Sequence, residues 1–405
     1  MHLSHIVLMF MAMLLFAVVL APLARRMHLP FSALLVLGGF FGSELIVAAG
    51  FDTGLRWHHF HDLIFFLLLP SLIFESAINL KVGLFLRNLL PVLILSIPLM
   101  LFSALVTAFV LYLGIAHSVG FPFIAALLAG VILSATDPVA VLDLFKRLKA
   151  PERLSILVDG ESLLNDATAI VAFGIILSMA QMGEISFSIS SSVLQFGKIF
   201  FGGMAVGLVT GGLSTLLYKL EIGGVVQGVI SLVSAYGSFI IAEEFFGVSG
   251  VMAVLVAGLF IGWQRELHPK NYNHFLEELW EYNAYISNAI VFLLMGVTIT
   301  VGMFLEQWIA MLLGVAAILL SRAIAIFGFM PFISKLPGTE AVSLGYQAIM
   351  FWGGLRGAVV LALALSLPLE LDYWYTIQSI AYGVVLFTLF VQAPSIGLVM
   401  KRFRL

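Results

Sequence analysis

The sequence has 405 residues, of which 62% are hydrophobic and 10% charged, with a net charge of −3. Soluble domains carry roughly 25% charged residues, so the composition excludes an ordinary soluble protein. Apolar runs of about 20 residues, the length of a helix that crosses a bilayer, recur along the whole chain. The runs are continuous rather than alternating, which excludes a β-barrel. Cysteine is absent, which excludes disulfides and thiolate metal sites.

These features predict an all-α polytopic membrane protein made of a single transmembrane domain, residues 1–405. The first apolar run is counted as a membrane helix, because MHLSHIVLMF lacks the positive start and cleavage site of a secretory signal. Thirteen membrane segments are predicted, near residues 6–24, 31–49, 62–80, 88–113, 121–145, 154–181, 192–218, 224–246, 248–264, 276–300, 306–330, 340–367 and 374–400.

The basic residues predict the orientation of the chain. Thirteen spans put the termini on opposite sides of the membrane, and cytoplasmic loops carry the excess of Lys and Arg. With the N-terminus outside and the C-terminus in the cytoplasm, fifteen of the nineteen basic residues are cytoplasmic and only Arg56 is external. Lys198, Arg322 and Arg356 fall within spans. This bias supports both the segment count and the orientation.

Polar side chains at membrane depth are functional candidates, because an ionisable group at a helix centre costs about 2.5–3.5 kcal/mol on insertion scales. Glu75, near the inner end of the third segment, is interpreted either as an interfacial carboxylate or as a functional one. His58, His59 and His61 flank an external loop and are interpreted as solvated rather than as a metal site.

The fifth segment contains SATDPVAVL, with Asp137 at mid-span followed directly by Pro138. Proline cannot donate to the carbonyl of Ser134, four residues back, and its ring disfavours helical geometry at the preceding residue. We therefore expect the span to break here and to present free carbonyls, the Thr136 hydroxyl and a carboxylate together. A plain proline kink is the alternative, but it does not require an aspartate.

The sixth segment contains GESLLNDATAIV, which brings four polar groups into six residues of an apolar helix. Ser162 and Asp166 are four residues apart, as are Glu161 and Asn165, so all four share a broad face. Carboxylate, hydroxyl and amide oxygens make a hard site that suits Na⁺, K⁺ or Li⁺. Asp159 precedes this cluster and is expected to line the cytoplasmic entrance.

Two later segments carry an arginine each. Arg322, in the eleventh, needs a carboxylate partner, and Glu161 is the candidate; snorkelling of Arg322 towards the cytoplasm is the alternative. Arg356, in the twelfth, lies within FWGGLRGAV, where three glycines allow the helix to loosen or another backbone to approach. Two interrupted spans seven segments apart fit an inverted repeat, the best sequence indication of a transporter's midplane site.

Four stretches together resemble the monovalent cation:proton antiporters of the NhaP and animal Na⁺/H⁺ exchanger type: LLLPSLIFESAINL, SATDPVAVL, GESLLNDATAIV and FWGGLRGAV, in this order. The resemblance covers essentially the whole chain. It implies thirteen helices, with segments 5 and 12 broken and crossed. It also implies a homodimer with a dimerisation bundle (roughly 1–87 and 220–303), an ion-carrying bundle (roughly 88–190 and 304–405) and a linking helix (roughly 191–219).

The resemblance also implies roles for individual residues. Asp166 would be the essential carboxylate that binds the cation or the proton, with Asn165 as its neighbour. Thr136, Asp137 and Ser162 match positions around the bound ion, so that Na⁺ would contact Asp166, Ser162 and Thr136. Glu161 with Arg322 matches a stabilising ion pair, and Arg356 matches the arginine of the broken twelfth helix. Members often carry a long cytoplasmic tail, which we do not expect within these 405 residues.

The predicted function is exchange of a monovalent cation, most simply Na⁺ but with K⁺ or Li⁺ open, for protons by alternating access. The Asn-Asp pair suggests, by analogy with the family, electroneutral exchange. The protein is expected to be a non-enzymatic, cofactor-free homodimer in the inner (plasma) membrane, with the lipid bilayer and no nucleic acid as partner. A cation channel is the alternative, although no carbonyl filter such as TVGYG is present. An intramembrane enzyme or an ATP-driven pump is disfavoured because HExxH, GxSxG and GxxxxGK[ST] motifs are absent.

Overall fold

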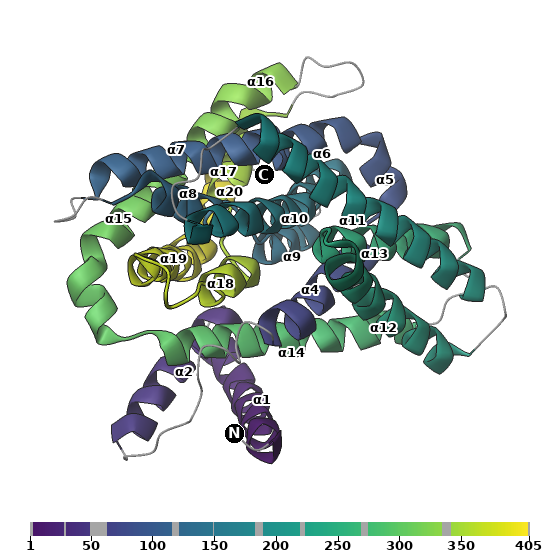
Figure 1. The fold of residues 1–405 in the computed structure, drawn as a ribbon, viewed down its shortest axis with the longest axis horizontal. Coiled ribbons are helices and arrows are strands. Elements are labelled where there is room, and N and C mark those ends of the chain that lie inside the picture. Colours follow the sequence, from purple (N-terminus) through teal and green to yellow (C-terminus); the bar gives the residue numbers. More distant parts are fainter. Residues whose placement is uncertain are drawn as a thin grey trace.

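The computed structural model describes residues 3–27, 30–48, 63–115, 121–148, 150–182, 189–218, 223–268, 274–333 and 342–403, and within them it contains helices and no strands. Figure 1 shows their arrangement. The α-helices are α1 (Leu3–Met27), α2 (Phe31–Ala48), α4 (Leu69–Asn79), α5 (Val82–Arg87), α6 (Leu89–Ser96), α7 (Pro98–Gly114), α8 (Phe123–Ile132), α9 (Val139–Leu148), α10 (Glu152–Met182), α11 (Ile189–Tyr218), α12 (Gly224–Ile240), α13 (Gly250–Leu267), α14 (Phe275–Thr298), α15 (Val301–Ala323), α16 (Met330–Ile333), α17 (Leu344–Trp352), α18 (Ala358–Leu365), α19 (Trp374–Phe387) and α20 (Ala393–Phe403). Four π-helical segments interrupt or extend them: η1 (Ile64–Leu68), η2 (Ile241–Phe245), η4 (Ile324–Phe329) and η5 (Thr388–Gln392).

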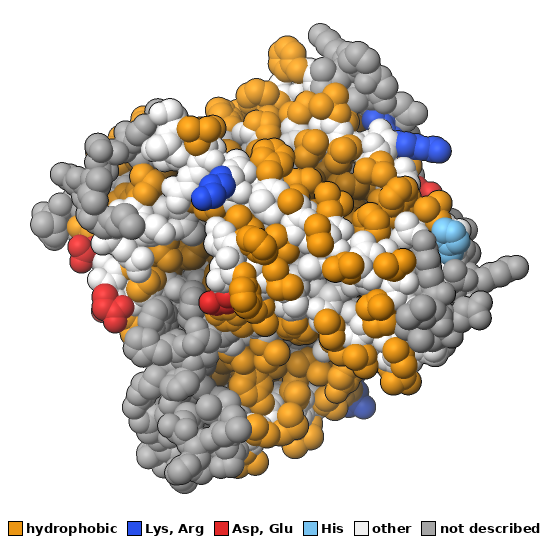
Figure 2. Space-filling view, turned by 45° about the vertical axis from the view of Figure 1, so that its right-hand side comes forward, with side chains coloured by type: hydrophobic (Ala, Val, Ile, Leu, Met, Phe, Trp, Pro, Cys, Tyr) orange, Lys and Arg blue, Asp and Glu red, His pale blue; other side chains and the backbone are white. Residues whose placement is uncertain are grey.

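The all-helical membrane fold predicted from the sequence is confirmed. Helix is present in each of the thirteen predicted segments, and seven helices of the described residues are long and apolar enough to cross a membrane. The number of crossings, thirteen, stays a prediction. Large apolar side chains cover much of the surface in Figure 2, as expected where lipid tails are the solvent.

The two predicted breaks are present and face each other. The fifth segment is divided into α8 and α9, and the twelfth into α17 and α18. The stretch between α8 and α9 and the stretch between α17 and α18 are not helical. In these stretches Asp137 pairs with Leu355 in an isolated antiparallel bridge, in which Asp137 N donates to Leu355 O at 2.8 Å. A backbone hydrogen bond thus joins the two breaks, and the expected pair of broken, crossed helices is confirmed.

Gly357 allows the two breaks to approach this closely. A Cβ atom at this position would lie 2.6 Å from Cγ of Asp137, which is shorter than any real contact. Only glycine therefore fits beside the aspartate side chain.

Gly357→Ala is expected to destabilise the protein by about 1–3 kcal/mol, because an added methyl group in a filled site forces its neighbours apart. The midpoint of thermal unfolding in detergent measures this loss. Gly212→Ala is the matched control, since apart from the neighbouring backbone of its own helix no atom lies within 4 Å of the Cβ position there. Equal midpoints for the two variants would contradict the proposed steric requirement.

The helices pack in two groups. We call α1, α2, α4, α12, α13 and α14 the scaffold group, and α6 to α10 with α15 to α20 the core group. In Figure 1, α14 runs between α1 and α2 on one side and α18 and α19 on the other. The groups contact each other where α14 meets α18, where α10 meets α13 and α4, and where α2 meets η5. The long helix α11 packs mainly on α13. The broken pair therefore belongs to one group and faces the other.

Candidate functional site

The carbonyl groups at the end of α8 are satisfied by Arg356. Its Nη1 atom donates to the carbonyl oxygens of Ser134 (3.1 Å) and Ala135 (2.8 Å), and the residue is 4% exposed. A positive charge at a helix C-terminus complements the helix dipole. The core arginine predicted in the twelfth segment thus reaches across and binds the broken end of the fifth.

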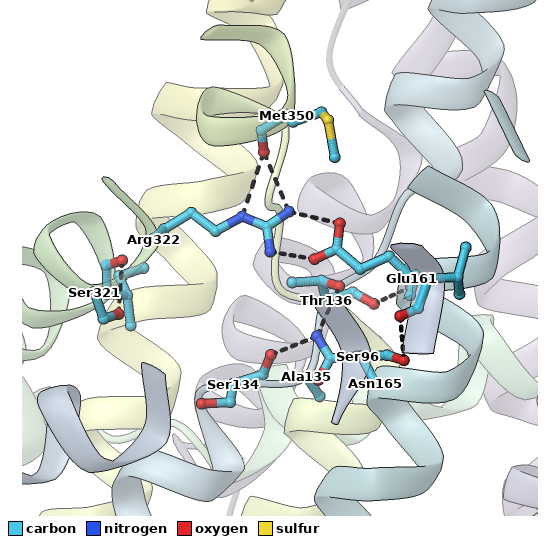
Figure 3. Close-up of polar contacts among 12 residues, drawn as sticks. Ser96, Ser134, Ala135, Thr136, Glu161, Asn165, Ser321, Arg322 and Met350 are labelled. Atoms are coloured by element: carbon cyan, nitrogen blue, oxygen red, sulfur yellow. Dashed lines mark hydrogen bonds and ion pairs between the residues drawn. The ribbon is translucent and has the colours of Figure 1, made fainter. Parts of the chain in front are cut away.

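Two side chains of α10 bind the same break from the other side. Asn165 Nδ2 donates to the Ser134 carbonyl at 2.9 Å and to Thr136 Oγ1 at 3.3 Å, as Figure 3 shows. Ser162 Oγ donates to the Thr136 carbonyl at 2.5 Å. The carbonyls of Ser134, Ala135 and Thr136 are therefore bonded to side chains, so the expectation that the break presents free carbonyls is wrong for these three. Unwound backbone at membrane depth is tolerated where it is buried in protein.

Oxygen atoms without hydrogen bonds gather beside this break. Asp166 Oδ1 and Asn165 Oδ1 are both buried and accept no hydrogen bond from the described residues. Asp137 Oδ1 accepts one, from the backbone N–H of Val139 at 3.0 Å. Buried polar groups are nearly always paired, and an exception calls for an explanation such as an ion that binds there.

A cavity of about 500 Å³ leads to Asp166 and Asp137, whereas Asn165 lies outside its lining. Asp137, Asp166, Ser162 and Thr136 line its inner part, together with Gly357. Its outer part is lined by charged and polar side chains from both helix groups, namely Glu75, Asn79, Lys81, Lys146, Glu152 and Asp159. Water and ions can therefore reach the carboxylates from the side of the molecule on which Lys81 and Glu152 lie.

The structure places Glu75 and Asp159 in this outer part. Glu75 accepts a hydrogen bond from Asn79 Nδ2 at 2.9 Å. Of its two interpretations, the functional one is favoured by its position in the cavity wall. The histidines His58, His59 and His61 lie outside the described residues, so their interpretation stays a prediction.

Glu161 and Arg322 form a two-pronged ion pair away from this cavity. Both terminal nitrogens of Arg322 donate to the Glu161 carboxylate, and its Nη2 and Nε also donate to the Met350 carbonyl, at 3.2 and 3.4 Å (Figure 3). The Arg322 side chain is 13% exposed and the Glu161 side chain 3%. The broad polar face of α10 is thereby divided, since Ser162 and Asp166 point to the cavity and Glu161 points to Arg322.

Two polar residues near the site were missed from the sequence. Asn288 of α14 lines the cavity from the scaffold group, and Thr388 Oγ1 lies 3.3 Å from the Arg356 carbonyl and 3.4 Å from its N–H. Asn288 is an amide within the apolar stretch NAYISNAIVF, which could have marked it. Thr388 gives no such signal, because a lone threonine in a membrane helix commonly bonds its own backbone.

Crossed, broken helices beside a carboxylate-lined cavity define a polytopic membrane protein of the secondary-transporter class. A family model described as the transmembrane sodium/hydrogen exchanger matches residues 12–402. The chain belongs to this family.

Individual proteins similar to this chain support its place in the family. The chain is 37% identical to the Na⁺/H⁺ antiporter ApNhaP of Aphanothece halophytica, over 85% of this chain and 65% of that protein. It is 34% identical to the low-affinity Na⁺/H⁺ antiporter NhaS1 of Synechocystis, over 94% and 70%. It thus spans about two thirds of the length of these relatives. The solved structure of the sodium proton antiporter MjNhaP1 from Methanocaldococcus jannaschii is similar in fold, with a TM-score of 0.81 at 19% identity and 99% of each chain covered.

Proposed function

We propose that this protein exchanges Na⁺ for protons across a membrane and that Asp166 holds either ion. The observation that carries the proposal is the buried Asp166 oxygen without a hydrogen bond, at the inner end of a cavity beside two crossed, broken helices. The relatives named as Na⁺/H⁺ antiporters support Na⁺ as the cation.

The donor set fits a monovalent hard cation. Asp166 offers a carboxylate, and the Ser162 hydroxyl keeps its lone pairs because it uses its hydrogen on the Thr136 carbonyl. Asp137 adds carboxylate oxygens in the wall of the same cavity. The unbonded oxygen of Asn165 lies beside the break but outside the lining of this cavity. Oxygen ligands of this kind suit Na⁺, K⁺ or Li⁺ rather than transition metals.

The same carboxylate explains why the movement of the cation is coupled to the movement of protons. A charged Asp166 is costly to move through an apolar barrier, whereas Asp166 that holds a cation or a proton is neutral. Each crossing thus needs one ion or the other, and a single carboxylate that alternates between them makes the exchange electroneutral. Glu161 with Arg322, and Arg356 on the α8 carbonyls, hold the break in shape during this movement.

Alternating access follows if the core group moves against the scaffold group. We propose that the scaffold group is the dimerisation bundle (residues 1–87 and 220–303) and that the core group is the ion-carrying bundle (88–190 and 304–405), joined by α11. The excess of basic residues on the side of the cavity mouth supports a cytoplasmic mouth, an internal C-terminus and residence in the plasma membrane. A cation channel, the other function considered, is disfavoured by a family whose relatives are named antiporters.

The test is dissipation of a pH gradient in everted membrane vesicles after addition of NaCl, KCl or LiCl. We expect Na⁺ to alkalinise the interior at a rate that saturates with concentration and is unchanged when a potassium-valinomycin clamp removes the membrane potential. Choline chloride is the salt control. No response to any of the three cations between pH 6 and 9, from protein shown to be inserted, would overturn the proposal.

A further inference from the structure

We propose that α5 is a tether between the two helix groups and that Glu266 is the positioning residue that fastens its scaffold end. This inference rests on the proposed alternating access. It concerns residues outside the ion site, of which Lys81 and Glu152 line the outer part of the cavity.

The scaffold end of α5 is held by one carboxylate of α13. Glu266 Oε1 accepts from the backbone N–H of Val82 at 2.7 Å, and Oε2 accepts from that of Gly83 at 3.0 Å. These N–H groups open α5 and have no partner within it. A helix of only six residues is not stable alone, so its first turn depends on this contact.

The preceding residue of α13 fixes the corner from which α5 starts. Arg265 Nη2 donates to the carbonyl of Ile78 at the end of α4 (3.0 Å), and Nη1 pairs with Glu277 of α14 at 3.1 Å. Gly262 lets α13 approach this end of α4, since a Cβ there would lie 2.8 Å from the Ile78 carbonyl oxygen. The corner is therefore anchored to three scaffold helices.

The other end of α5 is held by the core group. Asn88, the non-helical residue between α5 and α6, accepts from Arg153 Nε of α10 at 2.9 Å through its side-chain oxygen. The Phe85 ring packs on Gly160 of α10, where a Cβ would lie 2.9 Å away. Each end of the tether is thus fastened to a different group, with non-helical residues at Leu80–Lys81 and at Asn88 as its joints.

One further contact, an ion pair in the outer part of the cavity, joins the start of α5 to the core group. Lys81 Nζ lies 2.9 Å from Glu152 Oε1, and the two side chains are 62% and 73% exposed. Such an exposed pair is weak, whereas the Glu266 contact is doubled. When the core group moves, we infer that Lys81 and Glu152 separate while Glu266 stays on α5, so that α5 swings about its scaffold end.

Cross-linking tests which contact must break. The chain has no cysteine, so a flexible bifunctional thiol reagent joins only introduced pairs. When its two cysteines are joined, the variant Val82→Cys with Glu266→Cys should keep at least half of the exchange rate of its own unlinked form. Lys81→Cys with Glu152→Cys should lose more than nine tenths of its rate when joined and recover it when a cleavable linker is reduced. The unlinked form of each pair is its own control for folding.

The reverse pattern, or equal effects of the two links, would overturn the proposal. Glu266→Gln supplies a second measure, with Glu278→Gln, an exposed carboxylate of α14, as the matched control. We expect the maximal exchange rate of Glu266→Gln to fall several-fold while the Na⁺ concentration for half-maximal rate stays within twofold. A change in that concentration alone would contradict a tether. If unmodified protein shows no exchange, the proposed function fails; exchange with the wrong cross-linking pattern defeats the tether alone.

Discussion

Asp166→Asn is expected to reduce Na⁺-dependent proton exchange to the level of vesicles without the protein. The amide keeps the shape of the side chain but can neither release a proton nor neutralise a cation. Because Asp166 Oδ1 is buried without a hydrogen bond, which is unfavourable for folding, the variant should also unfold at the same temperature as the unmodified protein or higher. Vesicle exchange assays and thermal unfolding in detergent measure the two effects.

The combination of lost exchange and retained stability separates an ion-binding role from a structural one. Asp372→Asn is the control, since this aspartate is exposed in the short connection between α18 and α19. It should exchange Na⁺ normally. Normal exchange by Asp166→Asn would refute the assignment of the ion-binding carboxylate, and a large loss of stability would point to a structural aspartate instead.

Arg322→Met is expected to have the largest effect on stability. It leaves the Glu161 carboxylate buried without its counter-charge, and removal of one partner from a buried ion pair costs about 3–5 kcal/mol. The Met350 carbonyl loses its two donors as well. We expect the thermal midpoint in detergent to fall by several degrees and the yield of inserted protein to fall with it.

The double variant Glu161→Gln with Arg322→Met provides the decisive comparison. Replacement of both members of a buried pair is often neutral, so most of the lost stability should return. If the pair serves architecture only, as its separation from the cavity indicates, the double variant should also recover Na⁺ exchange. A double variant as unstable as the single one would argue against the ion pair as the cause.

Several features of the site could be predicted from local sequence because their physical causes are local. Pro138 removes a backbone donor wherever the chain goes, so the break at Asp137 follows from two adjacent residues. The spacing of Ser162 and Asp166 puts both on one side of a helix, and the structure places both in the cavity wall. The need of Arg322 for a carboxylate follows from the cost of a buried charge, and the structure sets Glu161 against it.

Other features depended on which elements meet. The sequence placed Arg356 within a membrane span but did not indicate that it binds the carbonyls of Ser134 and Ala135, more than two hundred residues earlier. It indicated that Gly357 permits a close approach but not that the approaching group is Asp137. The sequence did not single out Glu266, and only the position of α5 reveals its two hydrogen bonds.

The sequence by itself determined the class of protein, the helical segments and the position of the break at Pro138, because apolar length and proline geometry act within a few residues. The tertiary structure decided the partners of Arg356, the separation of Glu161 from Asp166, and the fastening of α5 by Glu266. These depend on backbone groups from distant segments, and a backbone carbonyl or N–H has no residue identity by which a sequence can mark it as a partner.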